Sequence, residues 1–392
     1  MNFQRKNVGH WGASDRNIEL PENISIFTAM NSFVRHDLPL NAKQREVFEA
    51  AGAALFAGLK NLEIQSLPIT DYNKNYLKDY QKRLFYGIET GLFILAHALF
   101  KTSKSMEEIT IIDHGGGTGL LSMLAQKCGF ASVIYNDIYE PSCKDAAIIA
   151  ASLKAAATHY VHGDIQQLSK FLKDQQITAN VIISRNVFEH IYDAASFLKT
   201  CAQLPGDDLV LFFATTSNPH NPAVKLYTQK LQRQAEWKGF SSRWGKASDN
   251  IRALREVRKE IILATGLSFS DKETEQLITL TRGLLKDEIV AGVQQYKTKG
   301  ILPAPYDGAF NTCDPFTGNW TERLTSVATI EKWFQSAGFD YETINGFYDT
   351  HYQKAWKNLI SRSLNSFIQP KGTTGLFFCP FIGLSGKKQK SR

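Results

Sequence analysis

A glycine-rich turn directly after a short β-branched run restricts the possible folds of this chain most strongly. The run Ile109–Ile112 leads into Asp-His-Gly-Gly-Gly-Thr-Gly at 113–119, and an apolar segment with helical spacing follows at Leu120–Cys128. A strand that passes through glycines into a helix lets a ligand approach the backbone and the free amides at the helix N-terminus. Dinucleotide enzymes use Gly-x-Gly-x-x-Gly at such a turn. The glycines at positions 115, 117 and 119 do not fit that spacing.

Short apolar runs and helical segments alternate around this turn. The expected strands lie at 109–112, 132–135, 159–161, 180–184 and 208–213, and the expected helices between them at 120–128, 141–154, 166–173 and 194–203. This alternation is typical of a parallel sheet with helices on both faces. Two further helical periodicities precede it, at 41–59 and 72–100.

A helix-rich stretch interrupts the alternation late in the chain. Helices are expected at 225–237, 249–264 and 272–296, before a returning helix at 330–337, a strand at 341–344, a helix at 352–367 and a strand at 375–384. We therefore predict an N-terminal irregular and helical segment (1–100), an α/β core (101–217), a helical insertion (218–320) and a return of the core with a basic tail (321–392).

Composition and charge limit the class of protein. The chain has 392 residues and a net charge of +7, and residues 219–300 hold 15 basic and 9 acidic side chains. Such an excess suits an anionic partner or a solvated helical face. Five scattered cysteines, no secretory leader and no apolar run of about 20 residues predict a cytoplasmic protein with no transmembrane segment, no disulfide framework and no metal site.

The motifs around the turn resemble those of class I S-adenosylmethionine-dependent methyltransferases. Asp113 with Gly115, Gly117 and Gly119 is similar to the family's first motif, and Asp137 stands 18 residues past Gly119 at the end of the second expected strand. The resemblance implies that S-adenosylmethionine is the cofactor. It implies that the glycines make room for the methionine part, that Asp113 orients the loop and the amino group, and that Asp137 accepts the ribose hydroxyls.

Two later segments extend the resemblance, which covers about residues 109–215. Gly163-Asp164-Ile165 is similar to the adenine clamp, which implies that Asp164 accepts from the exocyclic amine and Ile165 covers the ring, with Ile138 on its other face. The run 184–191, which includes Asn186 and a Glu-His pair, resembles the fourth motif. The implied fold is Rossmann-like and doubly wound, with a mostly parallel seven-stranded sheet.

Two histidines are candidates for the proton transfer that methylation of a hydroxyl or amine requires. His190 follows the fourth expected strand, and His220 follows the strand at 208–213. His114 departs from the family's usual aliphatic residue and puts a titratable group near the expected reaction centre. His190 and His114 each have an ordinary structural alternative, as a cap and as a packing residue.

The acceptor must be inferred from the helical insertion and the loop that returns from it. The segment 310–323 is rich in polar and aromatic residues, and its candidates for acceptor binding are Asn311, Asp314, Trp320 and Arg323, with Trp244 earlier in the insertion. Tight turns and packing would explain the same residue types. We expect a methyltransferase that acts at oxygen or nitrogen of a small-molecule or carbohydrate-like acceptor.

Two alternatives remain open. One is a methyltransferase acting on RNA or protein, although the sequence contains no recognisable nucleic-acid module. The other is a non-catalytic scaffold with the same fold, against which the three acids at 113, 137 and 164 argue. The sequence indicates neither the attacking atom nor the oligomeric state.

Overall fold

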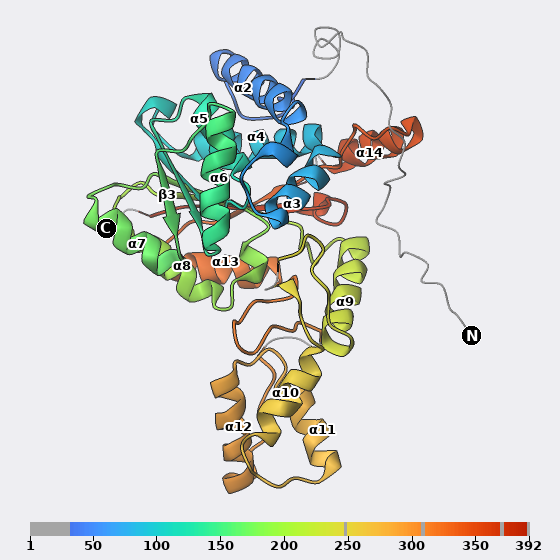
Figure 1. Cartoon of the computed structure of the whole chain (residues 1–392). Helices are drawn as coiled ribbons and strands as arrows, with labels where there is room; N and C mark the ends of the chain where they lie inside the picture. Colours follow the sequence, from blue (N-terminus) through green and yellow to red (C-terminus); the bar gives the residue numbers. More distant parts are fainter. Residues whose placement is uncertain (1–31, 247–248, 307–309, 369–371, 390–392) are drawn as a thin grey trace. The chain divides into compact units, whose positions relative to one another are not determined.

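The computed structural model describes residues 32–246, 249–306, 310–368 and 372–389, so the first 31 residues and the last three of the basic tail lie outside it (Figure 1). Seven strands form one sheet in the order β3-β2-β1-β4-β5-β7-β6. All neighbours pair in parallel except β7, which is antiparallel to both β5 and β6. The predicted mostly parallel seven-stranded fold is confirmed. The strands are β1 (Thr110–His114), β2 (Ser132–Asp137), β3 (His159–His162), β4 (Val181–Arg185), β5 (Val210–Thr215), β6 (Glu342–Asn345) and β7 (Ile382–Lys387).

Helices cover both faces of the sheet because the strands are apolar on both sides, as buried parallel strands are. One core joins Ile111, Val181 and Ile183 of the sheet to α2 (Ala42–Lys60), α4 (Leu84–Lys101), α5 (Leu120–Cys128) and α6 (Glu140–Ser152). The opposite core joins Ile112 and Ile182 to α7 (Ile165–Asp174), α8 (Ala194–Ala202) and α13 (Val327–Ser336). Among the described helices, α4 is the one long and apolar enough to cross a bilayer, and most of it is buried in the first core.

The helical insertion contains its own small core. It comprises α9 (Pro222–Trp237), α10 (Leu254–Leu263), α11 (Asp271–Leu280) and α12 (Lys286–Lys299), and the last three share a cluster of buried aliphatic side chains. Arg258 of α10 and Glu236 of α9 form a buried ion pair, and the carboxylate also accepts a hydrogen bond from Thr312 Oγ1 at 2.9 Å. The insertion is therefore attached to the loop that leads back into the sheet.

Several predicted elements differ from the structure in their bounds. The expected helix 72–100 is two helices, α3 (Asp71–Gln81) and α4, and the expected helix 272–296 is divided into α11 and α12. The last strand, expected at 375–384, starts only at Ile382, after the short helix α15 (Gly372–Gly375). Pro380 lacks an amide hydrogen and disfavours an earlier start of the strand. Helix α14 (Ala355–Ile368) starts three residues later than expected.

Candidate active site

The glycine loop between β1 and α5 forms an open cradle at the carboxyl edge of the sheet. Gly115, Gly117 and Gly119 have φ values of +71°, +55° and +82°, a region that side-chain-bearing residues seldom adopt. A Cβ atom at Gly117 would have no heavy atom within 4 Å, so space for a ligand lies beside this residue. Asp113, at the end of β1, is fully buried and accepts hydrogen bonds from Ser122 N and Oγ at 3.0 and 2.8 Å. It thereby holds the start of α5 against the loop.

Two acids at the ends of β2 and β3 face the same edge. Asp137 ends β2, and its Oδ2 accepts a hydrogen bond from Gly117 N at 2.9 Å while Oδ1 accepts from Tyr139 N at 2.8 Å. The neighbouring Ile138 is 72% exposed, which is unusual for so apolar a side chain. Asp164 caps α7 with Oδ1 alone, and no hydrogen bond to Oδ2 is found among the described residues. Its neighbour Ile165 is buried in the core below.

The end of β4 adds a strained residue and an arginine. Asn186 has φ +57° and its amide donates to Ala214 O, so its exposed side chain is held at the edge of the sheet. Side chains kept in such conformations concentrate at functional sites. Arg185 Nη1 lies 3.3 Å from Tyr80 Oη, and no carboxylate pairs with this guanidinium in the described part of the chain. No role for Arg185 was predicted from the sequence. The signal that could have indicated one is a charged residue at the end of an otherwise buried strand.

Tyrosines of α3 lie beside Arg185 and contact the insertion. Tyr76 stacks with Tyr80 at 6.4 Å, and the Trp244 ring meets Tyr76 edge-on at 4.8 Å. Lys246 Nζ, two residues further on, lies 4.4 Å from the centre of the Tyr139 ring. The structure therefore places Trp244 next to Tyr76 of α3, and Lys246 next to Tyr139, which follows Asp137.

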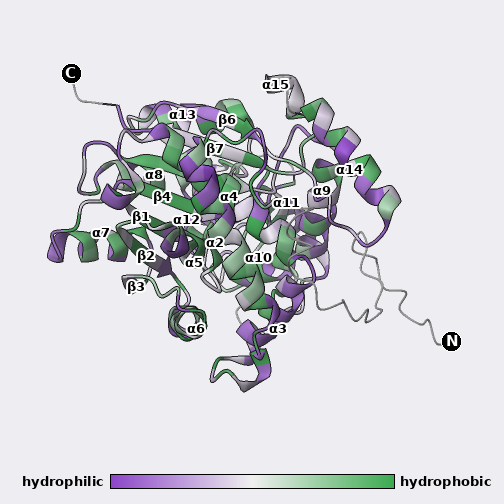
Figure 2. Cartoon of the chain, turned by 90° about the horizontal axis from the view of Figure 1, so that it is seen from above, coloured by the Kyte–Doolittle hydropathy of each residue, from purple (hydrophilic) through white to green (hydrophobic). Residues whose placement is uncertain are grey.

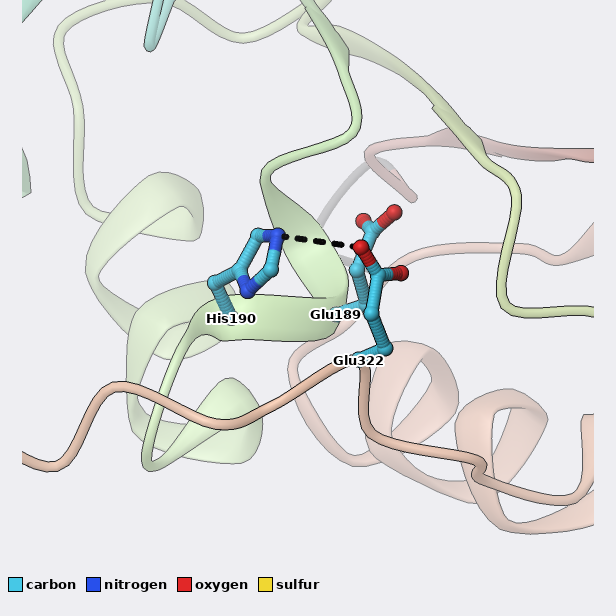
Figure 3. A group of neighbouring side chains, drawn as sticks. All are labelled: Glu189, His190 and Glu322. Atoms are coloured by element: carbon cyan, nitrogen blue, oxygen red, sulfur yellow. Dashed lines mark ion pairs between the residues drawn. The ribbon is translucent and has the colours of Figure 1, made fainter. Parts of the chain in front are cut away.

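The second part of the site is a group of two carboxylates and an imidazole, which Figure 3 shows converging from two segments. Glu189 and His190 lie in the short helix Phe188–His190 after β4, and Glu322 lies on the loop that returns from the insertion. One ligand atom from each lies within 4.8 Å of the others. His190 Nε2 is 3.9 Å from Glu322 Oε1, and Glu322 Oε2 accepts from Ser217 Oγ at 2.9 Å.

The returning loop fixes the orientation of His190. His190 Nδ1 is 2.8 Å from Trp320 O, an acceptor, so Nδ1 carries the hydrogen and the lone pair of Nε2 is directed at the carboxylates. Two backbone bonds, Trp320 N to His190 O and Arg323 N to Glu189 O, pair the two segments. In its neutral form, an imidazole oriented in this way can accept a proton or bind a cation.

The electrostatics of Glu189, His190 and Glu322 favour the uptake of a proton by this group. Burial, together with the negative charge of Glu322, raises the pKa of Glu189 to about 7. For His190, burial opposes protonation, but Glu322, Glu189 and the carbonyl of Trp320 outweigh it, so its pKa is raised. Neither side-chain oxygen of Glu189 has a hydrogen-bond partner among the described residues. A proton, a divalent cation or a positively charged ligand would each compensate this buried carboxylate.

The structure brings together only some of the candidates for catalysis and acceptor binding. His114 is buried and packs on Phe197, and its Nδ1 lies 2.6 Å from Asn136 Oδ1. Burial lowers its pKa. It is thus a packing residue that stays neutral. His220 lies on the loop after β5 with its ring 5.9 Å from that of Phe377, and its Nε2 is buried without a partner among the described residues.

The candidates in 310–323 mostly hold the returning loop in place. Asn311 Oδ1 accepts from Gln232 Nε2 and Leu324 N, while Asp314 Oδ1 accepts from two amides of its own turn. Trp320 is buried, and its indole Nε1 donates to Tyr192 O. Arg323 is buried, and its guanidinium carbon lies 4.7 Å from the centre of the Trp320 ring. These contacts hold the returning loop so that Glu322 lies next to His190.

Comparisons with known proteins show what part of this chain is similar to. A family profile described as a methyltransferase domain matches residues 80–257. Two curated relatives named ubiquinone biosynthesis O-methyltransferase are similar in part. The Caulobacter vibrioides protein is 35% identical over 109 residues, which are 28% of this chain and 41% of the relative. The Rhizobium johnstonii protein is 29% identical over 124 residues, which are 32% and 48%. The chain thus matches less than half the length of these relatives.

One solved structure illustrates how distant the structural likeness is. An S-adenosylmethionine-dependent methyltransferase from Thermotoga maritima is 9% identical, covers 81% of this chain and 98% of its own, and has a TM-score of 0.40. A likeness this low has no bearing on the function of this chain.

Proposed function

Because the chain contains a class I S-adenosylmethionine-dependent methyltransferase domain, we propose that it transfers a methyl group to oxygen or nitrogen of a small-molecule acceptor. The observation that carries the proposal is the position of His190. Its Nε2, which faces Glu322, lies just beyond β4, at the same carboxyl edge of the sheet as the glycine loop and Asp137. Open α/β sheets bind their ligands at this edge.

The residues at the edge fit the methyl donor. Gly117 leaves room for its methionine part, and the unpaired guanidinium of Arg185 suits its carboxylate. The Asp137 carboxylate suits the ribose hydroxyls, exposed Ile138 suits one face of the adenine ring, and Asp164 Oδ2 suits the exocyclic amine. Asn186 would border the methionine part. When bound, S-adenosylmethionine supplies a methyl group activated by its sulfonium sulfur.

His190 removes the proton of the acceptor in this proposal. Its Nδ1–H bond to Trp320 O holds the ring, and Nε2 takes the proton of the attacking hydroxyl or amine as the new bond to carbon forms. Glu322 and Glu189 stabilise the imidazolium that results. His220, on the loop after β5, is the second candidate for this role.

The small-molecule acceptor is supported by two features. The relatives are named as O-methyltransferases of ubiquinone biosynthesis, which favours oxygen as the attacking atom. Trp244 of the insertion contacts Tyr76, which neighbours the Arg185–Tyr80 pair, and Arg323 of the returning loop lines the same small pocket as Glu189. Asn311, Asp314 and Trp320 support that loop, and their direct contact with an acceptor stays a prediction. The expected cytoplasmic location belongs to the same proposal.

Labelled methyl transfer tests the acceptor class. Incubation of the protein with methyl-labelled S-adenosylmethionine and a fractionated cell extract should place the label in small molecules. Label in RNA or protein would show that the acceptor is a macromolecule and not a small molecule. A protein that binds the donor but labels no fraction would be a scaffold.

Gly117→Ala is expected to weaken donor binding about tenfold or more while the protein still folds, because the added methyl group enters the cradle. The matched control is Gly129→Ala. Gly129 also has a positive φ, +86°, and a Cβ there would likewise have no heavy atom within 4 Å, but it caps the far end of α5. In both variants the free energy of unfolding should fall by about 1 kcal/mol, because a Cβ atom is unfavourable in the left-handed backbone region. Calorimetric titration with S-adenosylhomocysteine separates them, and equal donor affinity in the two variants would argue against the cradle.

The rate of methyl transfer should rise with pH through an inflection above about 6.5, the ordinary pKa of histidine. The sign follows from the raised pKa of His190, because the protonated ring cannot accept the acceptor's proton. Glu322→Gln removes a negative charge beside Nε2 and should move the inflection to lower pH. The measurement is kcat against pH for both proteins, and an unchanged inflection would exclude His190 as the titrating group.

A further inference from the structure

Helix α14 buries mainly polar residues and exposes apolar ones. The residues it buries are Ser361, Asn365 and Ile368, two of which are polar. Asn365 is held in place by the backbone of Tyr348, whose amide donates to Oδ1 at 2.7 Å and whose carbonyl accepts from Nδ2 at 3.0 Å. A helix on the surface of a globular protein normally buries its apolar side.

The apolar residues of α14 lie on the exposed side. Trp356, Leu359 and Ile360 are 54%, 68% and 51% exposed and lie at helical spacings of three and four residues. Phe367 continues the stripe two turns later and its ring is 6.4 Å from that of Phe378, which is itself 41% exposed. We call Trp356, Leu359, Ile360, Phe367, Phe377 and Phe378 the α14 apolar surface. Figure 2 shows apolar and polar residues along this helix at the periphery of the described chain.

The same part of the chain is strongly basic. Residues 350–392 contain eight Lys and Arg and no Asp or Glu, so the remainder of the chain, with 37 basic and 38 acidic residues, is almost balanced. Lys354, Lys357 and Arg362 belong to α14 or directly precede it. An apolar stripe flanked only by basic side chains is typical of helices that lie in the interface of a membrane.

We propose that the α14 apolar surface docks on a bilayer that contains anionic lipid. Trp356 suits the headgroup level, where indole rings concentrate, and Leu359 and Ile360 enter the boundary with the acyl chains. The stems of Lys354, Lys357 and Arg362 extend so that their charges meet lipid phosphates. A second copy of the chain is a poorer occupant of a self-complementary contact, because it would oppose basic residues with the same basic residues.

The docking surface continues into the candidate active site. Phe377 contacts His220, and Asn218 Nδ2 donates to Leu376 O and Cys379 O, so the segment around α15 is attached to the loop after β5. A docked protein would therefore hold the carboxyl edge of the sheet near the lipid surface. This suits an acceptor that partitions into the membrane, although the docking itself does not depend on methyl transfer.

Vesicle sedimentation of the full chain tests the proposal. The protein should bind vesicles of equal parts phosphatidylcholine and phosphatidylglycerol, bind phosphatidylcholine vesicles much less, and be released by salt. Leu359→Glu with Ile360→Glu should weaken binding to the mixed vesicles about tenfold or more. The matched control is Leu226→Glu with Leu263→Glu, since Leu226 and Leu263 are 69% and 56% exposed on α9 and α10. The control variant should bind as the unchanged protein does.

A variant that removes the basic charges and a measurement of the oligomeric state complete the test. Lys354→Gln with Lys357→Gln and Arg362→Gln should reduce both the binding to mixed vesicles and its salt dependence. The proposal is overturned if the unchanged protein does not bind mixed vesicles, or if the control variant loses as much binding as the α14 variant. It is also overturned if sedimentation velocity shows a dimer that Leu359→Glu with Ile360→Glu dissociates while vesicle binding is absent. Circular dichroism confirms that each variant is folded.

Discussion

Asp137→Ala is expected to weaken the binding of S-adenosylmethionine by about a hundredfold or more. The two carboxylate oxygens of Asp137 accept hydrogen bonds from Gly117 N and Tyr139 N, so they lie between the glycine loop and the segment that follows β2. In the proposed complex they accept the ribose hydroxyls, and a hydrogen bond to a charged group contributes about 1.5–3 kcal/mol. Loss of two such bonds corresponds to at least a hundredfold change in Kd at about 1.4 kcal/mol per tenfold.

The control for Asp137 is the neighbouring exposed acid Glu140. Its carboxylate pairs with Lys144 on the surface of α6 at 2.8 Å, and such pairs contribute little to stability. Glu140→Ala should therefore bind the donor as the unchanged protein does. Calorimetric titration with S-adenosylhomocysteine compares the variants, and a folded Asp137→Ala protein with full affinity would remove Asp137 from the cofactor site.

His190→Gln should lower kcat by about two to four orders of magnitude, the usual contribution of a general base, while donor affinity stays the same. Glutamine occupies a similar volume but cannot take up a proton. His220→Gln is the comparison, because it alters the second candidate base, which lies on the loop after β5. Single-turnover transfer of labelled methyl measures both. A larger loss in His220→Gln than in His190→Gln would assign the base to His220.

A chelator gives an independent check on the role of Glu189, His190 and Glu322. The proposal that a proton is shared within this group predicts that prolonged treatment with EDTA leaves the rate unchanged. Loss of activity on chelation, with recovery on adding Mg²⁺, would instead assign the three side chains to a cation. It would also contradict the sequence-based expectation that no metal site is present.

Much of the cofactor side of the fold was predictable because its determinants are local. β-branched runs, glycines at a strand end and acids placed after successive strands specify β1 to β4 and the cradle between them. Asp113, Asp137 and Asp164 lie where the spacing placed them, at the carboxyl ends of β1 and β2 and directly after β3. The prediction of a methyltransferase domain is confirmed by the match over residues 80–257.

The breaks within long helical patterns were not predictable. Residues 72–100 have a continuous helical period, but Arg83 has φ −134° and separates α3 from α4. Tertiary packing accounts for the break, since the Tyr80 hydroxyl of α3 lies against Gly87 of α4, where an added Cβ would come within 2.0 Å of it. The break also positions Tyr80 beside Arg185. Periodicity alone carries no information about such a contact.

Only part of the proposed catalytic group could be identified from the sequence. Glu189 and His190 belong to a recognisable motif, but Glu322 is more than 130 residues away and reaches them through the returning loop. The polar character of 310–323 was noticed and interpreted as acceptor binding. In the structure, Asn311 and Asp314 hydrogen-bond within the loop and near it, and Trp320 orients His190. Long-range pairing of this kind depends on the fold and not on local spacing.

Binding of the methyl donor by the unchanged protein tests the central claim most directly. Isothermal titration of the purified full chain with S-adenosylmethionine, and then with S-adenosylhomocysteine, should give saturable binding at one site for both ligands. The same titration of Asp137→Ala should give little or no heat, while Glu140→Ala should match the unchanged protein. A folded, unchanged protein that binds neither ligand would contradict the assignment of the glycine loop, Asp137 and Asp164 to a methyl-donor site.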